Sequence, residues 1–117
     1  MTCETRFEEI LTSAGATVLR VNGRLDARSA STLTTRCAEI RAAGRHLVLN
    51  LAGVSFIASS GIGALLALVE DYRLARLQVR LAAISTPVES VLRLLNLEPF
   101  LHVDPSEEDA AQALKAA

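Results

Sequence analysis

The sequence predicts an α/β fold: a mixed sheet of about five strands, the first antiparallel, with about four helices on one face. Two strand patterns joined by a short turn open the chain, which indicates a hairpin. Strand and helix patterns alternate afterwards, as in a mainly parallel sheet with right-handed crossovers. The strands are apolar on one side and partly polar on the other, as Val18, Arg20 and Asn22 illustrate. Because sheets buried on both faces have nearly continuous apolar strands, we expect helices on one face only.

The first part of the chain is predicted to form the hairpin and one helix. Residues 7–12 have a weak strand pattern, residues 13–15 a turn, and residues 17–21 a stronger strand pattern. A helix is expected over residues 29–43, because apolar side chains recur there at helical spacing and Gly44 follows. The apolar positions of this helix are Ala30, Leu33, Cys37 and Ile40.

Three more strands and three more helices are predicted in the rest of the chain. We expect strands over residues 47–51, 79–84 and 100–103, and a helix over residues 60–77. Residues 86–89, Thr-Pro-Val-Glu, have the pattern of a capping box with proline at the first helical position. Asn96 suits the left-handed end of that helix. Residues 104–107, Asp-Pro-Ser-Glu, start a terminal helix by the same capping pattern.

Length and composition narrow the functional classes. A chain of 117 residues corresponds to one domain, whose core must be aliphatic because only 3% of the residues are aromatic. The 12 basic and 13 acidic residues are dispersed, so no nucleic-acid surface is expected. Cys3 and Cys37 have no metal-ligand spacing and do not make a disulfide framework. Reduced thiols in a cytoplasmic protein are the simpler interpretation.

One uncharged segment, residues 47–69, is long enough to span a bilayer. However, it contains Asn50 and several serines and glycines, and its first part has a strand pattern, so a buried strand–turn–helix unit explains it better. The first ten residues are acidic and lack the features of an export signal. We therefore expect a cytoplasmic protein, a monomer or a weak homodimer, without direct membrane insertion.

Common catalytic patterns do not occur in the sequence. His46 and His102 have neither ligand-like spacing nor a positioned partner. Ser59 follows Ile57 and Ala58, which excludes the nucleophile elbow of hydrolases. The glycines near this serine are not followed by the Lys-Ser or Lys-Thr of a phosphate-binding loop. We expect no enzymatic activity, no metal and no cofactor.

The most informative stretch is residues 51–63, LAGVSFIASSGIG, where a strand turns into a helix. Such a turn leaves the first amides of the helix unpaired. Ser59 and Ser60 can cap these amides, and the residues alone favour this interpretation. The other interpretation is a modification site, because a phosphate added there meets the positive end of the helix dipole.

Two motifs resemble those of a known family. Residues 54–63, VSFIASSGIG, resemble the signature of the STAS domain, in which a V-S-F/Y turn leads to D-S-S/T-G-L-G at a helix start. Residues 23–26, GRLD, resemble the family's G-E-L-D turn before the first helix. The order and spacing of elements fit over nearly the whole chain. The chain departs from these motifs at Ala58, in the place of Asp, and at Arg24, in the place of Glu.

The resemblance implies a STAS-like fold and a bacterial anti-sigma-factor antagonist. Such a protein binds an anti-sigma factor that is also a serine kinase, and thereby releases a sigma factor. The resemblance implies that Ser59 is the phosphoacceptor. Phosphorylation of this serine by the partner would end the interaction with the anti-sigma factor. It also assigns five residues to the partner-binding surface, whereas capping of the first helix is the simpler role for Asp26. These five are Asp26, Ser59, Ser60, Gly61 and Ile62.

Two alternatives remain open at this stage. Ala58 favours the first, a STAS module that is not phosphorylated and serves as a scaffold or as the cytoplasmic subunit of a transport assembly. The second is a small-ligand or nucleotide-binding domain that uses the amides at the Ser60 helix start. No basic residue lies within the motif to help hold a phosphate, so this alternative ranks last.

Overall fold

The computed structural model describes residues 5–12 and 15–116. Its sheet has five strands in the order β1-β2-β3-β4-β5. The strands are β1 (Arg6–Leu11), β2 (Ala16–Leu25), β3 (His46–Ile57), β4 (Val79–Ala82) and β5 (Val103–Asp104). The pair β1–β2 is antiparallel and all later pairs are parallel, which confirms the predicted mixed sheet and its opening hairpin. Of the predicted turn, residues 13 and 14 lie outside the described residues.

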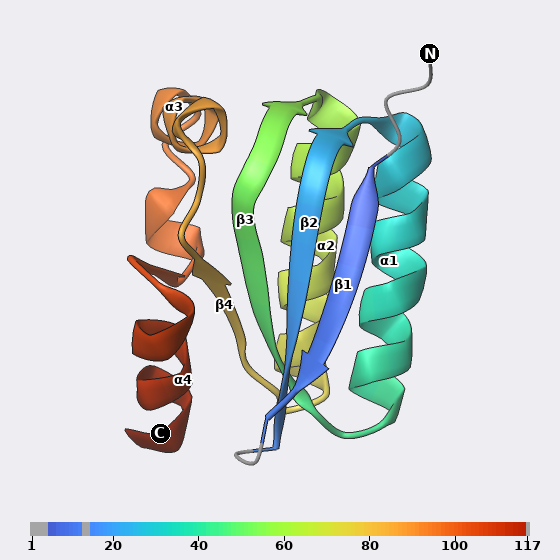
Figure 1. Cartoon of the computed structure of the whole chain (residues 1–117), viewed down its shortest axis with the longest axis vertical. Coiled ribbons are helices and arrows are strands. Elements are labelled where there is room, and N and C mark those ends of the chain that lie inside the picture. Colours follow the sequence, from blue (N-terminus) through green and yellow to red (C-terminus); the bar gives the residue numbers. More distant parts are fainter. Residues whose placement is uncertain (1–4, 13–14, 117) are drawn as a thin grey trace.

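Four α-helices and one short 3-10 helix connect or follow these strands (Figure 1). They are α1 (Ala27–Ala42), α2 (Ser59–Leu74), α3 (Thr86–Leu94), the 3-10 helix η1 (Glu98–Phe100) and α4 (Glu107–Ala116). The predicted alternation of strands and helices is confirmed. Of the strand predicted over 100–103, Phe100 ends η1, residues 101 and 102 are irregular, and only Val103 lies in β5.

The main core lies between one face of the sheet and α1, α2 and α3. Leu19, Leu49 and Leu81 from the central strands are fully buried against side chains of these helices. The helices contribute residues at helical spacing, among them Leu33 of α1, Leu65 of α2 and Leu92 of α3. Aliphatic side chains make up this core almost entirely, as the composition predicts.

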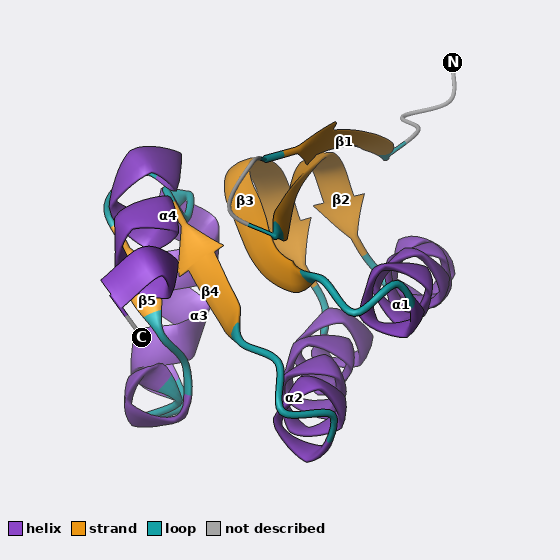
Figure 2. Cartoon of the chain, turned by 90° about the horizontal axis from the view of Figure 1, so that it is seen from below, coloured by secondary structure: helices purple, strands orange, loops and turns teal. Residues whose placement is uncertain are grey.

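The fourth helix corrects the expectation that all helices cover one face. Ala110 and Leu114 of α4 pack on Val18, Val48 and Ala82, which belong to the opposite face of the sheet. Figure 2 shows α1 and α2 side by side on one side of β2 and β3, with α4 apart from them across β4. The prediction of one uncovered, half-polar face is therefore wrong at the end of the sheet where α4 lies.

Ion pairs explain why a half-polar face accepts a helix. Glu107, at the start of α4, accepts hydrogen bonds from Arg20 Nε at 2.7 Å and from Asn50 Nδ2 at 2.5 Å. Asp104 pairs with Arg80 at 2.6 Å. The polar residues of β2, β3 and β4 thus find partners in β5 and α4, so burying this face leaves no polar group there unpaired.

Local capping differs from the sequence pattern in two places. The N-cap of α3 is Ser85 and not Thr86, and the Ser85 hydroxyl donates to the Val54 carbonyl at 2.6 Å instead of capping the helix. In α4 the hydroxyl of Ser106, two residues after Asp104, accepts from the Asp109 amide at 3.1 Å. The left-handed end of α3 is confirmed, since Asn96 has a φ of 55°.

Both central strands extend beyond their predicted ends, to Leu25 and Ile57, as a ribbon that β4 does not join. Register shifts interrupt the pairing of this ribbon at residues 20–22 and 23–24, so its side chains lose a simple alternation. Within the described residues, no helix is both long and apolar enough to cross a membrane. No group of potential metal ligands occurs in that part of the chain either.

Candidate functional site

Two strand-to-helix junctions meet at one end of the sheet. Asp26 lies between β2 and α1, and Ala58 lies between β3 and α2 (upper end in Figure 1). The Ala58 amide donates to the Leu25 carbonyl at 2.9 Å, which ties the two junctions together. The parallel pairing of β2 and β3 thus brings two motifs that are more than thirty residues apart in the sequence into one site.

Asp26 is the N-cap of α1, as the simpler interpretation predicts. One of its carboxylate oxygens accepts from the Ser29 amide at 3.3 Å, and the Ser29 hydroxyl accepts in return from the Asp26 amide at 2.9 Å. The hydrogen bond from the Ser29 amide holds the pKa of the Asp26 carboxyl below its ordinary value. Asp26 is therefore ionised at neutral pH and half-exposed at the junction.

The start of α2 has no such cap. Ala58 occupies the N-cap position and its methyl group accepts no hydrogen bond. Ser59 and Ser60 are the first two helical residues, one and two positions after the N-cap, so the capping role that the residues favour is not formed. Both serines are exposed, and neither hydroxyl has a hydrogen-bond partner among residues 5–12 and 15–116.

Gly61 and Ile62 lie beneath this surface. Both are buried, and a Cβ atom on Gly61 would lie 2.7 Å from the Leu25 carbonyl oxygen. Gly61 is therefore required for the close approach of α2 to the end of β2. Of the five residues assigned to partner binding, Asp26, Ser59 and Ser60 reach the surface, whereas Gly61 and Ile62 can only shape it from below.

Two further residues lie at this end of the molecule and were not among the predicted site residues. The Arg24 guanidinium lies 4.1 Å from the centre of the Phe56 ring, and Phe56 is 40% exposed. The motifs contain both residues, but their contact depends on the register shift that brings Arg24 opposite Phe56. No sequence pattern gives that shift, because it depends on the backbone of the ribbon.

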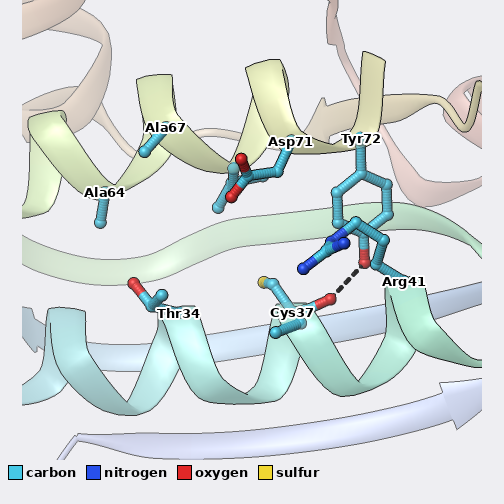
Figure 3. Close-up of a pocket in the computed structure, with 9 residues that line it drawn as sticks. Thr34, Cys37, Arg41, Ala64, Ala67, Asp71 and Tyr72 are labelled. Carbon is cyan, nitrogen blue, oxygen red and sulfur yellow. Dashed lines mark hydrogen bonds between the residues drawn. The ribbon is translucent and has the colours of Figure 1, made fainter. Parts of the chain in front are cut away.

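A pocket of about 140 Å³ between α1 and α2 is the main rival site (Figure 3). Cys37 lines it, and the Tyr72 hydroxyl donates to the Cys37 carbonyl at 2.7 Å. Burial raises the pKa of the Cys37 thiol to about 12, so the thiol is protonated at neutral pH and unreactive. Arg41 and Asp71 point toward the pocket from its two helices, but no activated nucleophile is present among its lining residues.

Residues 9–110 match the family model of the STAS domain. The chain belongs to the STAS domain family. This confirms the resemblance that the motifs at residues 23–26 and 54–63 indicate. The site described above is therefore the end of the STAS domain at which both motif segments meet.

Solved structures of other STAS domains share the fold. The anti-sigma-factor antagonist SpoIIAA in its unphosphorylated form is 21% identical, with a TM-score of 0.79 over 96% of this chain and 98% of that one. An anti-sigma-factor antagonist from Mycobacterium paratuberculosis is 22% identical, with a TM-score of 0.83 over 96% and 95%. At these identities the likeness establishes the fold alone.

The same fold also occurs in a membrane transporter. The murine solute carrier 26 family member A9 anion transporter is 24% identical over 92% of this chain, with a TM-score of 0.75. This chain covers 19% of that protein. The STAS fold therefore occurs both in anti-sigma-factor antagonists and in a transporter, so the fold alone does not distinguish these two functions.

Proposed function

We propose that this STAS domain is an anti-sigma-factor antagonist whose binding to an anti-sigma factor with serine kinase activity is controlled by phosphorylation of Ser59. The observation that carries the proposal is the exposed hydroxyl of Ser59 at the start of α2, in the acceptor position of the family motif. In this proposal the unphosphorylated protein binds the anti-sigma factor in the cytoplasm and releases the sigma factor. The kinase uses ATP, and this chain needs no cofactor of its own.

The charge of a phosphate explains why the modification ends binding. A phosphoserine carries a charge of about −1.5 to −2 at neutral pH. The α2 helix tolerates that charge, because its first amides have no side-chain cap and lie at the positive end of the helix dipole. A partner surface packed against Ser59 does not tolerate it, since a buried charge without a counterion is expensive. The switch then acts by local repulsion and desolvation, with little refolding.

Asp26 contributes to the same surface in this proposal. Its carboxylate is half-exposed and ionised beside the α2 start, so it adds a fixed negative charge to the unphosphorylated surface. Ser60 lies next to Ser59 and is also exposed, but the acceptor in the family motif is the first of the two serines. Ser60 therefore belongs to the contact surface and is not modified.

The direct test is phosphorylation by the partner. The protein is incubated with ATP and each purified serine-kinase anti-sigma factor of the source organism, followed by intact-mass measurement and peptide mapping. We expect one phosphate, at Ser59. Ser59→Ala should bind the kinase constitutively, because it cannot gain the charge, and Ser59→Asp should bind more weakly, although one charge only partly imitates phosphate.

Ser60→Ala is the matched control, since it removes the neighbouring hydroxyl from the same exposed helix turn. This variant should still gain one phosphate. Phosphate found only at Ser60 would make the Ser59 assignment wrong. If no kinase of the set binds or phosphorylates the protein, the antagonist function itself is wrong.

Two observations favour a second candidate function. Ala58 removes the motif carboxylate beside the proposed acceptor, and a transporter shares the fold. In this candidate the chain is a STAS scaffold or the cytoplasmic part of a transport assembly, and Ser59 is never phosphorylated. Binding to a transporter's membrane domain, without phosphate transfer from any kinase, would support it.

A further inference from the structure

We infer that the open end of the β2–β3 ribbon, centred on Arg24 and Phe56, binds an acidic surface of the partner kinase. This inference rests on the proposed function and adds to it the chemistry of the partner. We call the surface the ribbon face. It comprises Asn22, Arg24, Ala52, Gly53, Ser55 and Phe56.

The ribbon face is a part of the sheet that no helix within residues 5–12 and 15–116 covers. Pairing of β3 with β4 ends at Asn50 and Ala82, and the residues that pack on α4 lie on the other side of this point, toward Ala16. Beyond it, Leu25, Val54 and Ile57 are buried in the main core with α1 and α2. All six residues of the ribbon face are exposed, and none of them belongs to the buried core. Among the described residues, this sheet face beside the Ser59 junction is therefore open to a partner.

Close contacts hold the backbone and side chains of this face in place. Gly53 lies so close to Asn22 that a Cβ atom would meet the Asn22 side-chain oxygen at 1.7 Å. The Asn22 side chain thus lies across Gly53 and fills the space that a side chain at residue 53 would take. The Thr5 hydroxyl donates to the Arg24 carbonyl at 2.5 Å and holds the edge of the ribbon in place. A surface that is already held in place loses little conformational entropy when it is covered.

Arg24 and Phe56 supply the residue types that dominate binding energy at protein interfaces. The stacking at 4.1 Å orders both side chains before any partner arrives. Arginine and large aromatic residues are enriched among the few side chains that carry most of the affinity of a complex. Phe56 is 40% exposed, so part of its ring is open to a partner.

The charges around this face indicate an acidic partner. Arg24 forms no ion pair within residues 5–12 and 15–116, and the same holds for Arg6, opposite Asn22 on β1, and for Arg28. Arg28 lies in the first turn of α1, which contains no acidic residue. A positive charge at a helix N-terminus interacts unfavourably with the helix dipole, so the charge of Arg28 does not stabilise α1. The Asp26 carboxylate, at the N-cap of α1, offsets part of this positive charge. A carboxylate-rich partner surface would compensate the rest.

The test measures binding of Arg24 variants to the kinase that binds the wild-type protein, by isothermal titration at several salt concentrations. Arg24→Glu should weaken binding roughly tenfold to hundredfold, because it sets a like charge against the acidic surface. Arg24→Lys should retain part of the affinity, since it keeps the charge but loses the planar stacking. Added salt should weaken wild-type binding more steeply than that of Arg24→Ala.

Arg76→Glu is the matched control, because Arg76 is also exposed and lies just beyond α2, at the opposite end of this helix from Ser59. This variant should bind within about twofold of wild type, since a distant charge is largely screened. Circular dichroism confirms that each variant is folded. If Arg24→Glu binds and is phosphorylated as wild type is, this inference is wrong while the proposed function stands. If the wild-type protein binds no kinase, the proposed function is wrong and this inference with it.

Discussion

Asp26 and Ala58 hold equivalent positions, each as the N-cap of a helix at the same end of the sheet. Asp26 accepts a hydrogen bond from the helix that follows it, whereas Ala58 leaves the first amides of α2 without a side-chain acceptor. A single residue therefore makes the two helix starts chemically different. The α1 start is neutralised by its own carboxylate, and the α2 start keeps its partial positive charge.

This difference predicts the effect of Ala58→Asp. The backbone of Ala58 is extended, with φ −90° and ψ 170°, which is the conformation that an N-cap residue adopts. An aspartate there should accept from the free amides and raise the free energy of unfolding by about 0.5 to 2 kcal/mol. Urea unfolding followed by circular dichroism measures it. The matched control is Ala52→Asp, which adds the same charge at an exposed strand position. An equal change in both variants would assign the effect to net charge and contradict capping.

At the scale of the element, the contact between α2 and β2 depends on a residue without a side chain. Gly61 and Gly63 are two residues apart on the same helix, but only Gly61 faces the Leu25 carbonyl. Nothing lies within 4 Å of a Cβ atom built on Gly63. Packing against β2 thus requires a glycine at residue 61, whereas no packing constraint requires one at residue 63.

Alanine substitutions at the two positions should therefore change stability in opposite directions. Gly61→Ala should lower the free energy of unfolding by about 1 to 3 kcal/mol, because the new methyl group overpacks against the Leu25 backbone. Gly63→Ala should raise it by about 0.5 to 1 kcal/mol, because alanine has the better helix propensity. Urea midpoints at constant m-value give both numbers. Equal shifts of the same sign would show that α2 moves freely relative to β2.

The start of α2 illustrates which part of the site can be predicted from the sequence. The motif gives Ser59 and Ser60 at a helix start, because strand, turn and glycine signals are local. The burial of Gly61 cannot be predicted from the motif, since it depends on a close approach to Leu25, which lies on a strand far away in the sequence. The stacking of Arg24 on Phe56 also depends on pairing between strands, and on a register shift in addition.

At the scale of the whole molecule, strand order and helix number follow from local periodicity, whereas the position of α4 does not. The polar residues Arg20 and Asn50 suggest a solvent-exposed face when each strand is read alone. Their partner, Glu107, is almost sixty residues beyond Asn50 and belongs to another element. Only the folded chain brings the opposite charges together, so a half-polar face can be a buried one.

The Glu107 contacts make the stability of the whole fold depend on pH. Hydrogen bonds from Arg20 hold the pKa of the Glu107 carboxyl below its ordinary value of 4.5. Because this pKa is lower in the folded than in the unfolded state, the stabilising contribution is complete above about pH 4.5 and is lost as the pH falls through the folded-state pKa. Asp26 shifts in the same direction, so both carboxylates predict weaker stability in acid.

Glu107→Gln should remove this contribution at neutral pH. The amide cannot accept both Arg20 hydrogen bonds as a charged group does, so the free energy of unfolding should fall by about 1 to 2 kcal/mol at pH 7. The control is Glu108→Gln, which makes the same change at the next, exposed position of α4. Urea unfolding at pH 7 and pH 3 measures the difference. The gap between wild type and Glu107→Gln should narrow at pH 3, because protonation removes the same charge from the wild-type protein. A gap that stays constant between the two pH values would mean that Glu107 stabilises α4 by packing and not by its charge.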